Sequence, residues 1–269
     1  MNIVHYSKPS PQKKEGEDAI VLNPAARVYG VMDGVTPIVD YRDEDGHNGA
    51  YLASNTIRVY LERLQGSINL KESMVAANGA IRQAMLDSGI DLNVKHGLWA
   101  SCFAAAYVDE TGGISYAQIG DCMAIARYAD GRVQVLTENR VSGVAARAKV
   151  KRAKEREMGK TVEDESYFEN VHARIVYHRT FMANTAEGYG VANGTPEMES
   201  YIQAGVVPAE GLTHLLLISD GMFHPGLPLE TTMERIVQEG FEPYVEQVEA
   251  AEKEKGMNPD DRSAVLFTF

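Results

Sequence analysis

The sequence predicts an α+β fold in which two antiparallel sheets pack on each other and carry pairs of helices on their outer faces. Strand and helix patterns come in blocks, whereas a doubly wound sheet would alternate one strand with one helix. Short turns separate successive strand candidates, as is typical of antiparallel neighbours. The chain has 269 residues and is 44% hydrophobic, which is enough to bury a full core. Without a linker or repeat, we expect residues 1–269 to form a single domain.

The first part of the chain contains one clear strand and two helices. Residues 28–35, VYGVMDGV, are small and β-branched up to the turn-like Asp33-Gly34, which predicts a buried strand. Apolar residues recur at helical spacing over residues 47–64 and again over residues 70–89. We therefore expect two consecutive helices after the first strand.

Four short strand candidates follow the helices. They cover residues 101–109, 113–121, 122–131 and 132–137. Turn residues rich in Gly and Asp separate them. We expect successive hairpins and hence an antiparallel meander.

A charged segment, about residues 138–172, interrupts the strand pattern. It contains AARAKVKRAKEREMGK and few large apolar residues, which predicts a solvent-exposed helix and a loop. Long segments of this kind are often functional, so we expect a flap-like insertion over a site.

The last part of the chain returns to alternating blocks. Residues 173–182 and 213–219 are predicted to be strands, and residues 229–241 and 242–256 helices. Residues 263–269, SAVLFTF, are expected to form the closing strand.

Composition excludes several functional classes. The formal charge of -12 disfavours both a nucleic-acid surface and binding to anionic membranes, because these need dense Lys and Arg. No apolar run is long enough to cross a bilayer, so we expect a cytoplasmic protein. Cys102 and Cys122 form no CxxC and are expected to be buried free thiols. Nothing in the sequence specifies an oligomeric state.

Acidic residues gather where the strand candidates end. Three apolar runs end at Asp33, Asp121 and Asp220. Two acidic pairs precede further apolar runs, Glu17-Asp18 and Asp260-Asp261. Each acid alone is well explained as a turn residue, but their common placement predicts a shared rim.

Like charges on one rim repel each other, and a bound cation removes the repulsion. Carboxylates without nearby His or Cys describe an oxygen site suited to Mg²⁺ or Mn²⁺. Two such ions activate a water and neutralise a phosphoryl group during in-line displacement. The sequence therefore predicts a centre for hydrolysis of phosphate esters.

Five motifs in order along the chain resemble those of the metal-dependent protein Ser/Thr phosphatases of the 2C type. They are GEDA, VYGVMDGV, AQIGDCMAIARYADGRVQVLTENR, LLLISDGMF and DDRSAVLFTF. The resemblance covers nearly the whole chain, and the bacterial members are the most similar in motif. It implies a four-layer α-β-β-α sandwich with two antiparallel sheets, flanking helix pairs and two Mn²⁺ or Mg²⁺ ions, with a third, weaker one in bacterial members.

The same resemblance assigns roles to the acids. Asp33 matches the ligand that bridges both ions, with Asp220 and Asp260 on the first ion. Glu17 and the Gly34 carbonyl match the ligands of the second ion, and Asp18 their supporting acid. Asp121, with Asp220, matches the site of a third ion. The implied nucleophile is a metal-bridging hydroxide.

One residue departs from the family pattern, and one ligand position has two candidates. Lys13, with Lys14 beside it, aligns with an Arg that binds phosphate in some members, and a Lys lacks the bidentate geometry of Arg. Asp260 and Asp261 compete for one ligand position, and aligning Ser263 with the hydroxyl residue that opens the last strand favours Asp260.

The sequence thus predicts a phosphomonoesterase that acts on phosphoserine and phosphothreonine in proteins. A pseudophosphatase that keeps the fold as a regulatory binding module is the first alternative, because the first Asp-Gly motif is followed by Val35 and a long acidic loop. A two-metal hydrolase of small phosphorylated metabolites is the second.

Overall fold

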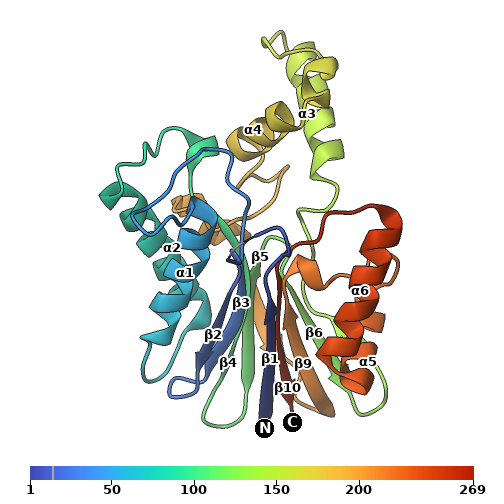
Figure 1. The fold of residues 1–269 in the computed structure, drawn as a ribbon. Helices are drawn as coiled ribbons and strands as arrows, with labels where there is room; N and C mark the ends of the chain where they lie inside the picture. The colour runs from blue at the N-terminus through green and yellow to red at the C-terminus, as the bar shows by residue number, and fades with distance from the viewer. Residues whose placement is uncertain (14) are drawn as a thin grey trace.

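The computed structural model describes residues 1–13 and 15–269. Two five-stranded sheets pack face to face, and helices cover the outer face of each (Figure 1). The predicted α+β sandwich of four layers is confirmed. Both chain termini lie at one end of the sandwich, and the helical arm described below lies at the other.

The first sheet has the strand order β1-β10-β9-β6-β7, and its paired strands are antiparallel. Its strands are β1 (Asn2–Lys8), β6 (Met123–Tyr128), β7 (Val133–Val135), β9 (Leu212–Ile218) and β10 (Arg262–Thr268). The second sheet has the order β2-β3-β4-β5-β8, also antiparallel. Its strands are β2 (Ala19–Asn23), β3 (Val28–Gly34), β4 (Ser101–Val108), β5 (Ile114–Ile119) and β8 (Gln203–Val207).

Four helices form the outer layers at nearly the predicted positions. Helices α1 (Gly49–Glu62) and α2 (Leu70–Asp87) cover the second sheet, and α5 (Leu229–Glu239) and α6 (Phe241–Lys255) cover the first. Asn48 and Asn69 cap α1 and α2 by accepting hydrogen bonds from backbone N–H groups of the first turn, which stabilises a helix start.

Alternation along the strands divides the core into three layers. Val31 and its inward-facing neighbours fill the space between the sheets, whereas Met32 packs under α1 and α2. A third cluster lies between the first sheet and helices α5 and α6, with Leu216 and Tyr244 fully buried. Successive side chains of a strand point to opposite faces of the sheet, so a strand covered on both faces contributes alternate residues to two layers of the core.

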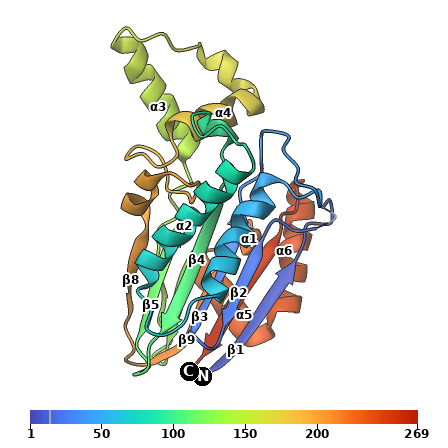
Figure 2. The same ribbon diagram turned by 90° about the vertical axis from the view of Figure 1, so that its left-hand side faces the viewer.

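The charged insertion forms a helical arm. Helix α3 (Val144–Glu157), the 3₁₀ helix η2 (Glu165–Glu169) and helix α4 (Val171–Phe181) project beyond one edge of the sandwich (Figures 1 and 2). The expected exposed helix is thus present as α3. Three further 3₁₀ helices are η1 (Lys95–Gly97), η3 (Pro196–Tyr201) and η4 (Asp220–Met222).

Two secondary-structure predictions are wrong. Residues 173–182 form most of α4 and not a strand, because Ala173 and Tyr177 are buried four residues apart and Asn170 caps the helix. The predicted meander is also wrong, since β5 and β6 belong to different sheets. The chain crosses between the sheets at Gly120, whose φ of +81° a residue with a side chain rarely adopts.

Three edge strands, β1, β2 and β8, were not predicted as strands, although the residues of β2 were noted as an apolar run. Each has one sheet neighbour, and each keeps exposed residues such as Val4 and Val206. An edge strand lacks the strong apolar alternation of a covered strand. Within the described residues, no helix is both long and apolar enough to cross a membrane.

Candidate metal centre

The four acids predicted at strand ends lie at one edge of the sandwich. Asp33 is near the end of β3, and Asp220 directly follows β9. Asp121 lies in the crossing between β5 and β6, and Asp260 precedes β10 by two residues. The predicted shared rim is therefore present.

The strand register explains why these segments share an edge. In the first sheet, Ile218 at the end of β9 pairs with both Met123 at the start of β6 and Ala264 near the start of β10. In the second sheet, Gly34 at the end of β3 pairs with Ser101 at the start of β4. Antiparallel pairing thus places one strand's end beside the next strand's start.

The glycines of both Asp-Gly pairs allow close backbone approach rather than a turn. A Cβ on Gly34 would lie 2.6 Å from the Glu17 carbonyl oxygen and 2.8 Å from that of Ala50. A Cβ on Gly221 would collide with the carbonyl oxygen of Asp261. Because glycine has no side chain, Asp33 can lie close to the segment of Glu17, and Asp220 can lie close to the segment of Asp261.

The gathered carboxylates raise one another's pKa values. Burial raises the pKa of Asp33 well above its ordinary value, and neighbouring negative charges, that of Asp220 first, raise it further. Burial and the charge of Asp121 do the same to the pKa of Asp220, although a hydrogen bond with Asp33 offsets part of the rise. The carboxylates that interact in this way are Asp18, Asp33, Asp121, Asp220 and Asp260.

Asp18 and Asp121 face the same interior. Burial raises the pKa of Asp18 to about 7, and the charge of Asp261 adds to the rise. Burial also raises the pKa of Asp121, and a hydrogen bond with the Cys102 thiol offsets part of that rise. Asp18 Oδ2 is buried without a hydrogen-bond partner among the described residues. An orphaned carboxylate oxygen inside an acidic cluster fits a hard divalent cation, which takes oxygen ligands.

Asp261 holds the N-terminal loop against the centre. Its side chain is 2% exposed, and its carboxylate accepts hydrogen bonds from the backbone N–H groups of Ser10 and Glu17, both at 2.7 Å. The Asp260 side chain is 56% exposed and its charge acts on Asp33 and Asp220. This geometry favours Asp260 as the ligand and leaves Asp261 as the loop anchor.

Glu17 is held from both sides. Asn48 Nδ2 donates to Glu17 Oε1, and Lys13 Nζ lies 2.8 Å from Glu17 Oε2. Asn48 also caps α1, so one residue fixes both the helix start and the carboxylate. The sequence analysis did not single out Asn48, although an Asn directly before a helical pattern is a recognisable capping signal.

Lys13, whose predicted role in binding phosphate stays a prediction, contacts carboxylates in the structure. Its Nζ also lies 2.9 Å from Asp261 Oδ2 and 3.4 Å from Asp260 Oδ1. Burial lowers the pKa of Lys13, but the hydrogen bonds and charges of Glu17 and Asp261 outweigh that effect and raise it. Lys14, predicted to bind phosphate, lies outside the described residues.

A second acidic group lies in the loop after Asp33-Gly34. Asp43, Asp45 and His47 form the one trio within residues 1–13 and 15–269 whose possible ligand atoms all lie within 4.8 Å of one another. The predicted ligands at the sandwich edge are spaced more widely than that. Hydrogen bonds within the loop occupy the trio, including Asp43 Oδ2 to His47 Nδ1 at 3.1 Å, so a turn explains it fully.

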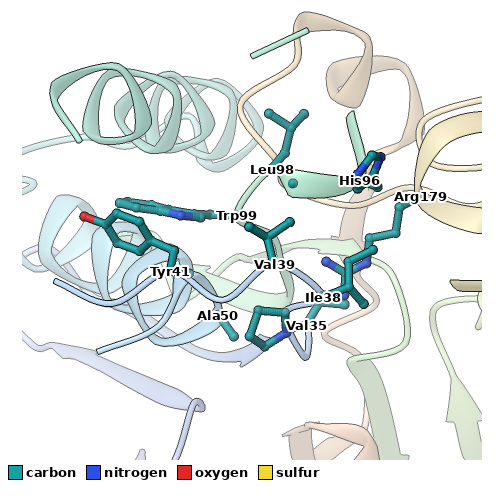
Figure 3. A pocket seen from close by; sticks show the side chains of 12 residues that line it. Val35, Ile38, Val39, Tyr41, Ala50, His96, Leu98, Trp99 and Arg179 are labelled. Atoms are coloured by element: carbon teal, nitrogen blue, oxygen red, sulfur yellow. The ribbon is translucent and has the colours of Figure 1, made fainter. Parts of the chain in front are cut away.

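Three cavities adjoin the centre. One of about 690 Å³ opens beside Glu17, between the N-terminal loop and the loop that carries His47, and one of about 440 Å³ is lined by Asp18 and Asp261. The third, of about 10 Å³, lies beside Val35 (Figure 3). That smallest volume holds about one water, so the two larger cavities have the room for a substrate group.

Comparison with known proteins identifies the family and the fold of this chain. Residues 14–260 match the family described as protein phosphatase 2C. This chain belongs to the protein phosphatase 2C family. It is therefore a metal-dependent protein Ser/Thr phosphatase by family, and the resemblance seen in the motifs is confirmed. No curated protein matches the sequence.

Solved structures share the fold of this phosphatase. Stp1 from Staphylococcus aureus is 15% identical, with a TM-score of 0.61 over 99% of this chain and 94% of that one. PppA from Pseudomonas aeruginosa is 16% identical, with a TM-score of 0.61 over 100% and 97%. The catalytic domain of PstP, solved with two manganese ions, is 16% identical, with a TM-score of 0.58 over 98% and 96%.

Proposed function

We propose that this phosphatase hydrolyses phosphoserine and phosphothreonine esters in proteins at the edge where the two sheets meet. The observation that carries the proposal is the convergence of Asp33, Asp121 and Asp220 from separate strands, with pKa values raised by burial and by their mutual charges. Such a cluster is costly without cations. The pattern favours turnover over a binding module that has lost its metal.

The donor set divides between two principal ions, Mn²⁺ or Mg²⁺. Asp33 would contribute to both sites, Asp220 and Asp260 would hold one ion with it, and Glu17 and the Gly34 carbonyl would contribute to the other. Asp18 supports these ligands, and Asp121 with Asp220 offers a third, weaker site. When bound, the ions activate water for in-line attack and neutralise phosphoryl charge.

The protein's own residues hold this arrangement in place. Asn48 orients Glu17 through its side-chain amide, and Ser54 Oγ donates to the Glu17 carbonyl at 2.5 Å. Asp261 fastens the N-terminal loop, and the cavity beside Glu17 receives the phosphorylated side chain and its flanks. Positioning of this kind contributes a large part of enzymatic rate enhancement.

Neither cysteine is available as a nucleophile. Cys102 and Cys122 are buried, and burial raises the pKa of both thiols well above the ordinary value. A thiolate is the reactive form of cysteine. We therefore propose attack by water, without a phosphoenzyme intermediate, in a cytoplasmic enzyme.

Residues 138–172, predicted as a flap, belong with the rest of α4 to the helical arm, and in this proposal the arm acts as that flap. The arm lies beyond the same edge of the sandwich as the acids (Figure 1), and Arg179 of α4 donates a hydrogen bond to the carbonyl of Thr36, three residues after Asp33. This contact joins the base of the arm to the loop that leaves the metal centre.

One assay separates the proposal from its alternatives. Phosphate release is measured from a phosphothreonine peptide and from p-nitrophenyl phosphate, with Mn²⁺ and with EDTA. We expect Mn²⁺-dependent release from both, abolished by EDTA and lowered by several orders of magnitude in Asp33→Asn. Turnover in excess EDTA would refute the metal mechanism, and no turnover of any substrate would indicate a pseudophosphatase.

A further inference from the structure

Lys13 places a positive charge among the acids assigned to the metals. Its ammonium nitrogen contacts Glu17 at 2.8 Å, Asp261 at 2.9 Å and Asp260 at 3.4 Å. The side chain is 27% exposed, so the ammonium is partly shielded from water. Contacts of this kind are stronger than surface ion pairs, because screening by solvent and salt is weaker there.

The three contacts involve acids with different assignments. An ammonium has three N–H donors, which equals the number of carboxylates in contact with Lys13. Glu17 and Asp260 belong to different proposed metal sites, whereas Asp261 anchors the N-terminal loop through backbone hydrogen bonds. The ammonium therefore spans both metal sites while it is tied to a residue that binds neither.

We infer that Lys13 is an internal counterion that competes with the divalent cations for Glu17 and Asp260. The inference rests on the proposed function, which makes these two acids metal ligands. Cation binding displaces the ammonium from both acids, and Asp261 retains it beside the centre. Lys13 thereby stabilises the metal-free protein and weakens its affinity for metal.

The expected size follows from Coulomb's law. A unit charge about 6 Å from a divalent cation at a dielectric constant near that of water opposes binding by an energy worth about tenfold in affinity. Removing the charge also takes away the cation that contacts these three carboxylates, so the metal-free protein loses stability.

The test compares Lys13→Met with Lys13→Arg, which keeps the charge. Lys8→Met is the matched control, because Lys8 at the end of β1 pairs with Glu249 of α6 at 2.5 Å and with none of the proposed metal ligands. Mn²⁺ affinity is measured by calorimetry on metal-stripped full-length protein, and Tm is measured in EDTA. We expect Lys13→Met to bind Mn²⁺ about tenfold more tightly and to melt lower in EDTA, whereas the other two variants stay near wild type.

Unchanged or weaker Mn²⁺ binding by Lys13→Met would overturn the inference while leaving the proposed function intact. Wild-type protein that binds no Mn²⁺ would overturn both. A measurement on the wild type does not depend on the variant folding: the ¹⁵N resonance of the Lys13 ammonium should shift on addition of Mg²⁺. A resonance that stays unchanged while Mg²⁺ binds would reject the competition.

Discussion

At the residue scale, Asp260 and Asp261 show how adjacent acids acquire different roles. The buried Asp261 carboxylate is surrounded by N–H donors from the N-terminal loop. Asp260 accepts the backbone N–H of Asp261 at 2.8 Å and remains largely exposed to the cleft. Alternation near the start of a strand sends neighbouring side chains to opposite sides. The charge of Asp260 acts on Asp33 and Asp220, whereas Asp261 acts on Asp18 and holds the loop.

The first prediction separates these two roles. Asp260→Ala should lose Mn²⁺ affinity and turnover while keeping wild-type stability in EDTA. Asp261→Ala should lower the free energy of unfolding by about 2–4 kcal/mol, because it leaves buried N–H donors without an acceptor. Urea denaturation and Mn²⁺ titration check both variants, and the reverse order would assign the metal to Asp261. Asp261→Asn keeps one acceptor oxygen, so its free energy of unfolding should lie between that of Asp260→Ala and that of Asp261→Ala.

The second prediction concerns the stability cost of the acidic cluster. Repulsion and burial raise the pKa of Asp33, so its charged form destabilises the fold at neutral pH. Asp33→Asn should therefore raise Tm in EDTA and abolish the further rise that saturating Mn²⁺ gives the wild type. Calorimetric melting with and without Mn²⁺ measures both effects. A lower Tm of the variant in EDTA would show that repulsion does not dominate there.

At the element scale, the strand ends need glycine where two acidic segments meet. Gly34 packs against the backbone of Glu17 and Ala50, and Gly221 packs against Asp261. Gly79, inside α2, has open space around it. The same residue type is therefore required at the rim and replaceable in the helix.

The third prediction uses that contrast. Gly221→Ala should destabilise the protein by several kcal/mol, because the added methyl group overlaps backbone that cannot move cheaply. Gly79→Ala should be neutral or stabilising by up to about 1 kcal/mol, since Ala favours helix. Chemical denaturation measures both, and equal effects would contradict close packing at the rim.

The arm is held by a second ionic arrangement. Arg152 donates to both carboxylate oxygens of Glu165, at 2.9 and 2.8 Å, and its guanidinium lies 4.0 Å from the centre of the Phe168 ring. The hydrogen bonds from Arg152 lower the pKa of Glu165 to about 2. An acid whose pKa is lowered by folding stabilises the fold at pH values above its ordinary pKa, here 4.5, and this contribution is lost as the pH falls toward 2.

The fourth prediction follows from that sign. Glu165→Gln should loosen the arm by about 1 kcal/mol near neutral pH, a modest value because the carboxylate is partly exposed. The difference from wild type should shrink as pH falls from about 4.5 to about 2. Hydrogen exchange of α3 and α4 amides, with the exposed Glu169→Gln as control, measures it. A constant difference across that range would reject the ion pair as the cause.

At the scale of the whole molecule, the sandwich places chemistry at one edge and the arm beyond it. Each sheet contributes acids from strands far apart in sequence, and the helices on the outer faces support the sheets from behind (Figure 2). The apolar core between the sheets ends at the acids. The metal centre therefore lies between this core and the open cavity beside Glu17. Because the rim lies at the edge of the sandwich, a substrate as large as a protein can reach it.

The fifth prediction is made at this scale. Mn²⁺ at about a hundred times its dissociation constant should stabilise the whole sandwich by about 2.7 kcal/mol, because both sheets contribute ligands. Hydrogen exchange should slow in strands of both sheets, β3 and β9 alike. Protection confined to one sheet would mean that the ligands do not bridge the layers.

The sequence by itself determined the layers, most elements and the acids. Period-two apolar runs, helical spacing and Asp residues after strands are local patterns, so they are visible without the fold. Order along the chain then sufficed for the family, whereas the assignment of individual residues to metal stays a prediction. Edge strands β1 and β8 escaped because exposed strands carry little pattern.

Only the tertiary structure decided how distant segments meet. It turned residues 173–182 into a helix, because burial and capping by Asn170 outweigh strand propensity. It split the expected meander between two sheets at Gly120. It placed Lys13 against three carboxylates and Asn48 against Glu17. Apart from the contact between Lys13 and Glu17, which are four residues apart, these contacts join residues distant in the chain, and no local pattern encodes a distance across the fold.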